Sequence, residues 1–148
     1  MTTPPDFNTE TAEYLLIFRD TDLDLRIPEP AIEEAMHRMS AWLNDCRKRG
    51  VIKGGQPLAR PGRRIARPKA KQPSVVVDGP FSETKEIVGG YVVIFARDLD
   101  EAAAIADTWP MLDYGSSVEV RPLLEGCPLM ARYGLSCTGA ETAVEVAG

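Results

Sequence analysis

Two apolar runs on either side of a polar segment constrain the fold of this chain more than any other feature. The runs, residues 75–77 and 91–96, are rich in Val, Ile, Tyr and Phe, which favour half-buried strands. The segment between them opens with Asp78-Gly79-Pro80 and closes with Gly89-Gly90, residues that are typical of turns. We therefore predict two strands joined by a structured loop, with the rest of the chain organised around them.

Three further strands are indicated. Residues 14–18 are continuously apolar, which predicts a central strand covered on both faces. Residues 51–58 are interrupted by Gly54-Gly55, which indicates a bulge, a close approach of another group, or only a twisted edge. Residues 118–121 alternate Val-Glu-Val-Arg, as in a strand buried on one side. In 91–96 both alternating sets are apolar, so one set is expected to cover the helices and the other to face a second subunit.

Two helices are predicted at 30–49 and 98–109. In the first, apolar residues recur every three or four positions, and Gly50 follows the last turn. The second begins with Asp98 and Glu101 at the spacing of a capping box. The residues expected to face the sheet are Ile32, Met36, Met39, Leu43 and Cys46, with Trp42 beside them, and Leu99, Ala102, Ala103, Ile105, Ala106 and Trp109.

Several spaced blocks between Tyr14 and Pro122 resemble the YCII-related proteins that carry a DGPF motif. The blocks are Tyr14-Leu15-Leu16-Ile17, Asp78-Gly79-Pro80-Phe81 with Glu83, Lys85 and Glu86, Gly89-Gly90-Tyr91, Asp98-Leu99-Asp100-Glu101-Ala102, and Val118-Glu119-Val120-Arg121-Pro122. The resemblance implies an α+β domain of ferredoxin-like βαββαβ type, with an antiparallel sheet that pairs into a dimeric α+β barrel. It implies a homodimer but no activity, because most members have no assigned chemistry.

This resemblance suggests a division of the chain into a flexible leader (1–12), a YCII-related domain (13–122) and a C-terminal extension (123–148). The extension holds apolar residues that we expect to fold back on the core or on the partner subunit. They are Leu123, Leu124, Leu129, Met130 and Tyr133.

The composition suits one domain with a substantial core, at 148 residues and 44% hydrophobic. No apolar run approaches the roughly 20 residues of a membrane helix, and the first residues do not resemble a signal peptide. We therefore expect a cytoplasmic protein that does not bind membranes. Its three cysteines, Cys46, Cys127 and Cys137, are expected to be reduced, with a disulfide between the last two as the alternative. No metal or cofactor motif is present.

Charge is distributed unevenly along the chain. The net charge is −5, but six basic and no acidic residues fall within residues 60–71, which leaves −11 for the rest. This basic arm is either a solvated hairpin loop or a contact for an anion or an acidic protein partner. It lacks aromatic residues for base stacking, so nucleic acid is not expected to bind. The basic residues are Arg60, Arg63, Arg64, Arg67, Lys69 and Lys71.

Asp78 and Glu83 are the candidate catalytic residues. If both carboxylates meet in one pocket, repulsion raises the pKa of one of them and makes it an acid or a base. The alternative is that Asp78 only accepts hydrogen bonds from its own turn. The lone histidine, His37, lies off the apolar stripe and is interpreted as a surface residue. Candidate ligand-binding residues are Gly54, Gly55, Phe81, Lys85 and Tyr91.

These observations leave several functions open. The first is a dimeric protein that binds a small molecule, such as a small anion, in the barrel cavity. The second is a lyase or isomerase in which Asp78 is the acid or base, Glu83 modulates it, and Lys85 or the basic arm holds an anionic substrate. The third, suggested by the family resemblance, is a regulatory module that partners a transcription factor. A purely structural dimer is the remaining alternative.

Overall fold

The computed structural model describes residues 11–79 and 87–137. A four-stranded antiparallel sheet has the strand order β2-β5-β1-β6, and a separate hairpin pairs β3 with β4. The strands are β1 (Ala12–Arg19), β2 (Ile52–Pro57), β3 (Arg63–Ala66), β4 (Val75–Asp78), β5 (Val88–Ala96) and β6 (Ser117–Pro122). The helices are α1 (Glu29–Lys48), α2 (Leu99–Asp107) and α3 (Pro128–Ala131), with the 3₁₀ turns η1 (Leu23–Leu25) and η2 (Pro110–Tyr114).

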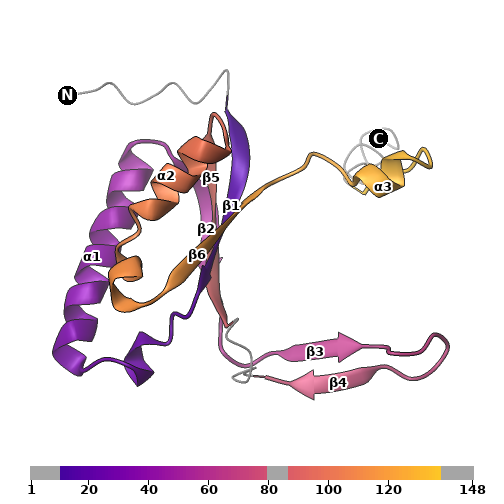
Figure 1. Ribbon diagram of the computed structural model, residues 1–148, viewed down its shortest axis with the longest axis horizontal. Coiled ribbons are helices and arrows are strands. Elements are labelled where there is room, and N and C mark those ends of the chain that lie inside the picture. The colour runs from indigo at the N-terminus through magenta and orange to yellow at the C-terminus, as the bar shows by residue number, and fades with distance from the viewer. Residues whose placement is uncertain (1–10, 80–86, 138–148) are drawn as a thin grey trace, which may run out of the picture.

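The main sheet has the topology that the sequence predicted. Without the hairpin, the elements follow β1-α1-β2-β5-α2-β6, and β1 lies between β5 and β6. Both long helices cover the same face of the sheet (Figure 1). This arrangement confirms the predicted α+β fold of ferredoxin-like βαββαβ type.

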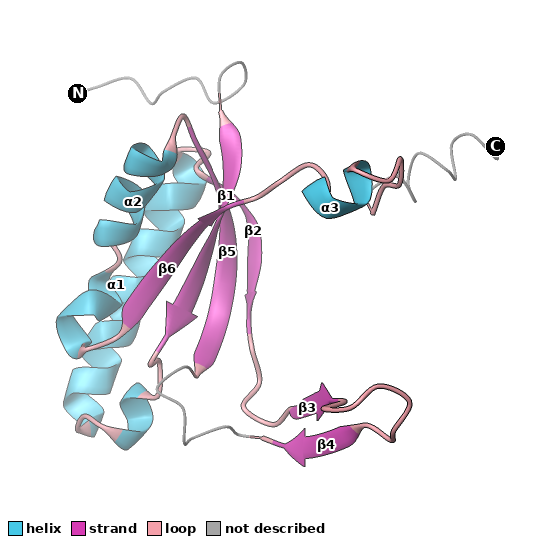
Figure 2. Cartoon of the chain, turned by 45° about the vertical axis from the view of Figure 1, so that its right-hand side comes forward, coloured by secondary structure: helices cyan, strands magenta, loops and turns pink. Residues whose placement is uncertain are grey.

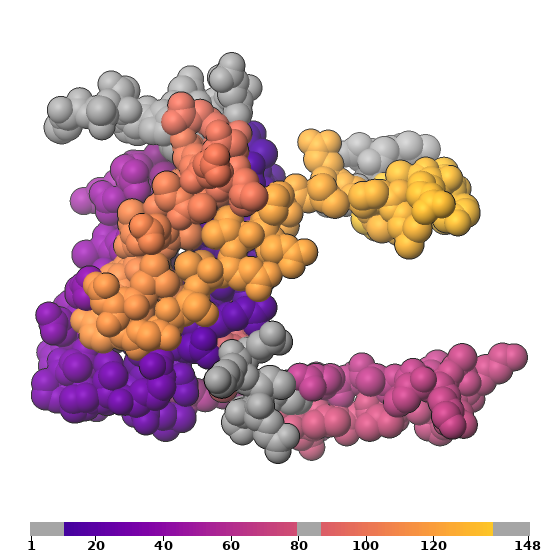
Figure 3. Space-filling model, viewed as in Figure 1, coloured from indigo at the N-terminus to yellow at the C-terminus, as the bar shows by residue number. Residues whose placement is uncertain are grey.

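One strand lies elsewhere than expected. Residues 75–77 form part of β4, which pairs only with β3, and Figure 3 shows this hairpin standing away from the body of the molecule. The idea that this run and 91–96 together organise the core was therefore wrong. The physical reason is that β3 precedes β4 by a short connection, so closing a local hairpin costs little loop entropy. The position beside β2 in the main sheet is occupied by β5.

Alternation along the two central strands builds the core. Tyr14, Leu16 and Phe18 of β1 point toward the helices and are buried. In β5, Val92 and Ile94 are buried on the same face. Because β1 and β5 pair along almost their full lengths, these side chains form one apolar layer.

The helices meet this layer mostly as predicted, with three corrections. Ala35, Trp42 and Cys46 of α1 are buried, whereas Met36, expected to face the sheet, is 45% exposed. The buried line of α1 passes through Ala35, and the next residue lies about 100° round the helix. In α2 the contact runs through Ala102 and Ala106, so two residues predicted in the packed face are exposed: Leu99, at 48%, and Ala103. Asp98 caps α2 as expected, accepting a bond from the Glu101 N–H at 2.8 Å.

The opposite face of the sheet is apolar at its centre. Leu15 and Ile17 of β1, with Val93 and Phe95 of β5, point to this side and are partly buried. Among the residues that the structure describes, no helix covers this face (Figure 2). We call these four residues the open-face cluster.

The described part of the C-terminal extension, residues 123–137, stands mostly away from the core. After β6 the chain leaves the sheet, and the short α3 stands apart from it (Figure 1). Leu124, Leu129 and Tyr133 are each more than half exposed, at 68%, 59% and 70%. The expectation that they fold back on the core was wrong for these residues. Contact with a partner subunit remains a prediction.

Candidate functional site

A cavity of about 540 Å³ lies between α1 and β2, the edge strand of the main sheet. It is on the helix side, because it reaches Phe18 and Val92, whose side chains lie on the core face. It therefore does not coincide with the open face, where the barrel interior was expected. Besides these two residues its walls include Met39, Trp42, Leu43 and Arg47 of α1, residues 52–57, residues 89–91, Thr21 and Trp109.

Two glycines of β2 shape the edge of this cavity. The register of β2 on β5 shifts between Ile52 and Gly54, which confirms the bulge that the paired glycines indicated. A Cβ atom at Gly54 would meet nothing within 4 Å, so this position leaves open space. A Cβ at Gly55 would lie 2.4 Å from the Tyr91 carbonyl oxygen and 2.8 Å from the Val92 Cα. Gly55 is therefore required for close pairing of the two backbones.

The two glycines should respond differently to substitution. Gly55→Ala places a methyl group against β5 backbone, which cannot move aside as a side chain can, and we expect a loss of about 1–3 kcal/mol in the free energy of unfolding. Gly54→Ala is the matched control and should change stability by less than about 0.5 kcal/mol. Urea unfolding at one protein concentration measures both. Equal losses at the two positions would contradict the structure.

Aromatic rings form the inner wall of the cavity. The Phe18 ring lies 4.3 Å from the Trp109 ring and 6.4 Å from the Trp42 ring, centroid to centroid. The Trp42 indole N–H donates to Thr108 Oγ1 at 2.8 Å, and the Trp109 indole N–H donates to the Met39 sulfur at 3.1 Å. Because both indole donors are already engaged, these rings offer a ligand mainly apolar surface.

Two charged residues line the cavity, and both are cationic. Lys53 Nζ lies 2.8 Å from Glu13 Oε1, so this ammonium group is already paired. Arg47, in the last turn of α1, has no ion pair or hydrogen bond from its side chain within the described part of the chain. Its neighbour Arg49 pairs instead with Asp45 at 3.1 Å. The cavity thus joins an apolar wall to an uncompensated guanidinium group.

The predicted site residues are only partly brought together. Gly54, Gly55 and Tyr91 all line the cavity. Phe81, Glu83 and Lys85 lie outside the described residues. Asp78 does not line the cavity. It ends β4, its side chain is 78% exposed, and its carboxylate accepts a hydrogen bond from Arg63 Nε at 3.0 Å.

The histidine and the cysteines offer little for catalysis. His37 has an 80% exposed side chain, which confirms its interpretation as a surface residue, and it lies 3.9 Å from Glu33. The three cysteines are free thiols, as expected. Burial raises the pKa of the Cys46 thiol, although a hydrogen bond from Arg49 opposes the effect. Within residues 11–79 and 87–137, no group of three or more His, Cys, Asp and Glu residues is placed to hold a metal ion.

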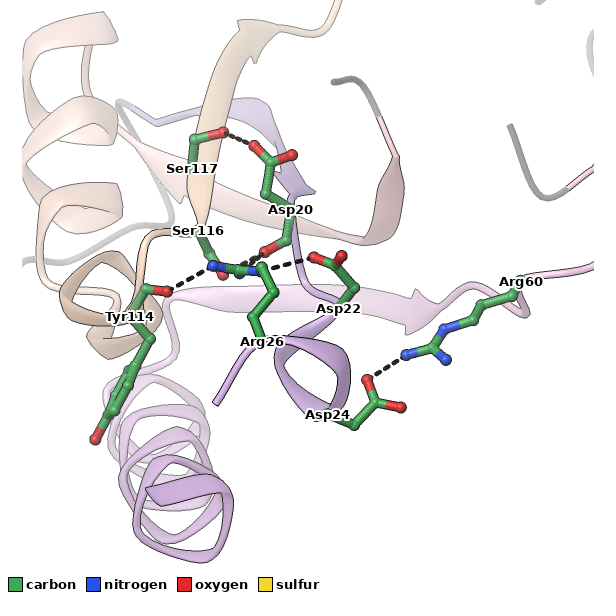
Figure 4. A network of polar contacts seen from close by, with 8 residues as sticks. All are labelled: Asp20, Asp22, Asp24, Arg26, Arg60, Tyr114, Ser116 and Ser117. Atoms are coloured by element: carbon green, nitrogen blue, oxygen red, sulfur yellow. Dashed lines mark hydrogen bonds and ion pairs between the residues drawn. The ribbon is translucent and has the colours of Figure 1, made fainter. Parts of the chain in front are cut away.

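Arg26 connects the end of β1 to the start of β6. Figure 4 shows its guanidinium group pointing at three acceptors: Asp22 Oδ1 at 3.0 Å, the Asp20 carbonyl at 2.7 Å and the Tyr114 carbonyl at 3.1 Å. Ser116 Oγ also donates to the Asp20 carbonyl at 2.7 Å. Asp20 has a φ of 55°, in the left-handed region. This network has a structural role, since it holds a strained corner of the chain.

The same corner holds the base of the hairpin. Arg60 forms an ion pair with Asp24 of η1 (Figure 4), and the hydrogen bond from Arg60 lowers the pKa of the Asp24 carboxyl group. Arg60, the first cation of the basic arm, is therefore paired within the subunit. No role was predicted for Asp24 or Arg26, because the polar connection between β1 and α1 carries no sequence signal of these contacts.

The open face also carries paired charges beside its apolar centre. Glu119 of β6 binds Arg19 at 3.0 Å and Arg121 at 3.1 Å. The hydrogen bonds from Arg121 and Arg19 lower the pKa of the Glu119 carboxyl group. The Glu119 carboxylate is therefore neutralised by two arginines of its own subunit, and it needs no basic group from a partner protein.

The fold and the cavity define the class of this protein, and the comparisons give its family. The chain is an α+β protein of ferredoxin-like topology with a ligand-sized cavity beside its edge strand. The family profile of the YCII-related domain matches residues 12–128, and the chain belongs to that family. No curated protein matches it. Over the described residues, none of the helices has the length and apolar character needed to cross a membrane.

Proposed function

We propose that this YCII-related protein is a homodimer that binds a small molecule in the cavity between α1 and β2. The observation that carries the proposal is the cavity itself. Its volume of about 540 Å³ falls within the range of roughly 300–1,000 Å³ that ligand pockets occupy. Its aromatic wall, its glycine-lined strand edge and its small number of polar groups are also typical of such pockets.

The open-face cluster supports the dimer. Leu15, Ile17, Val93 and Phe95 form a contiguous apolar surface across the two central strands. A contiguous apolar surface on a sheet is more often part of a protein interface than exposed to solvent. If a second copy packs face to face on this surface, the open-face cluster of each subunit covers that of the other, as two-fold symmetry requires.

Acid–base catalysis by Asp78 has less support than binding. The Asp78 carboxylate at the end of β4 is exposed and paired with Arg63, so it lies in solvent rather than in the cavity. The desolvation that tunes a catalytic carboxyl group is missing from such a position.

A protein contact through the basic arm is a second proposal. Every residue of β3 and β4 is exposed, including Ile65 at 69% and Val76 at 54%, and these two pair across the hairpin. A two-stranded hairpin alone is only marginally stable in water, so an acidic partner surface that covers its apolar residues would stabilise it. This is the contact that a regulatory module would use.

A fragment screen tests ligand binding in the cavity. Saturation-transfer NMR on the intact protein should find apolar fragments that bind, and Leu43→Phe should abolish most of these signals, because Leu43 lines the cavity and a larger ring fills it. Leu25→Phe is the control, since Leu25 is 72% exposed and is not among the residues that line the cavity. Fragments that bind both variants equally well would show that the cavity is not the binding site.

A further inference from the structure

We infer that the cavity selects an amphipathic anion, a molecule with an apolar aromatic or aliphatic body and one carboxylate, whose charge is received by Arg47. This inference rests on the proposed function and adds the chemical class of the ligand. Three features of the cavity support it: the charge of its lining, its inner wall and the placement of Arg47.

The charge of the lining has one sign. Arg47 and Lys53 are its charged residues among those described, and no carboxylate lines the cavity. This is notable in a chain whose net charge is −5. Lys53 is neutralised by Glu13, so the uncompensated charge belongs to Arg47. A cationic ligand would meet repulsion here, and a neutral ligand would leave the guanidinium donors to water.

The inner wall selects the other half of the ligand. Trp42 and Trp109 are 8% and 1% exposed, and their indole N–H groups are bonded within the protein. A polar ligand body would therefore lose hydrogen bonds to water without replacement at these rings. An aromatic or aliphatic body would instead bury apolar surface against them.

Arg47 stands on the line of α1 that forms the cavity wall. Met39, Leu43 and Arg47 are spaced by four residues and so lie on one side of the helix, and all three line the cavity. A guanidinium group offers a planar pair of donors that matches a carboxylate. The apolar body of the ligand and its acid group can thus be bound by consecutive turns of one helix.

The test compares 2-naphthoate with its neutral isostere 2-naphthamide. The chain has two tryptophans, Trp42 and Trp109, and both line the cavity, so quenching of tryptophan emission reports binding there. Calorimetry at constant ionic strength gives the dissociation constants. We expect the parent protein to bind naphthoate about 10-fold to 100-fold more tightly than naphthamide, as a charge-assisted hydrogen bond provides.

Four variants separate the contributions. Arg47→Gln should remove the preference for naphthoate over naphthamide. Lys48→Gln is the matched control, because it removes the same charge from the next position, which does not line the cavity. The double variant Arg63→Gln, Arg64→Gln tests attraction by the basic arm and should have no effect. Leu43→Phe should weaken both probes.

Each outcome has a defined meaning. Equal affinity for the two probes, with both weakened by Leu43→Phe, would overturn the ligand class and leave the proposed function standing. A preference for naphthoate that survives Arg47→Gln, or that is lost in the arm variant, would also overturn the role of Arg47. Absence of binding by either probe, or binding unaffected by Leu43→Phe, would overturn the cavity as a binding site and the inference with it.

Discussion

Val93→Glu should separate the proposed dimer into folded monomers. Val93 lies in the open-face cluster, paired with Leu15 of β1, and it is only partly buried within the subunit. A glutamate there can reach solvent in the monomer, but in the dimer it is buried without a partner. A buried unpaired charge costs about 3–5 kcal/mol, which weakens association by roughly 100-fold or more.

Sedimentation velocity, at a concentration where the parent protein is dimeric, measures this change. Circular dichroism of the same samples verifies that the subunit stays folded. Leu25→Glu is the control, because Leu25 is 72% exposed in η1 and places the same charge away from the open face. The proposed interface would be excluded if the parent protein sediments as a monomer, or if Val93→Glu remains a dimer.

Trp109→Ala should cause the largest loss of stability of any single substitution considered. Trp109 is 1% exposed, contacts the Phe18 ring and donates its indole N–H to Met39. Truncating a buried tryptophan removes its transfer free energy and leaves a void that neighbouring groups fill only in part, which typically costs about 3–5 kcal/mol. Because Trp109 also lines the cavity, the substitution enlarges the binding site.

Urea unfolding gives the stability of the variant, and Tyr133→Ala provides a control of similar size change. Tyr133 is 70% exposed beyond α3, so its truncation should cost less than about 0.5 kcal/mol. If Trp109→Ala does not fold, Trp109→Phe provides the milder test and should lose about half as much. A Trp109→Phe variant as stable as the parent protein would contradict the packing described for this ring.

The local elements were predictable because each depends on neighbours in the chain. The alternation along β5, the cap formed by Asp98 on Glu101, and the glycines of the β2 bulge all act within a few residues. The signals that predict them are hydrophobic periodicity, helix capping and turn-forming residues, and each signal involves residues close together in the sequence. The free thiols and the surface position of His37 could be inferred for the same reason.

Apart from Gly54, Gly55 and Tyr91, the residues that line the cavity could not be predicted, because its walls meet only through tertiary packing. Arg47 has the ordinary place of a cation at the C-terminal end of a helix, and nothing in the sequence distinguishes it from Lys48. Its importance comes from Lys53, whose pairing with Glu13 leaves Arg47 as the uncompensated charge. Glu13 and Lys53 are 40 residues apart, so their contact depends on β1 and β2 entering the same sheet.

Sequence patterns alone predicted the family, the ferredoxin-like order of helices and strands, and the apolar character of both faces of the central strands. Three features depend instead on tertiary packing: residues 75–78 form a separate hairpin outside the core, Asp78 at the end of β4 lies in solvent, and the ligand-sized cavity is on the helix side of the sheet. The reason is that strand pairing is a competition between distant segments, which depends on loop closure and on which partners remain available. The pattern within a strand shows that it pairs, but not with which partner.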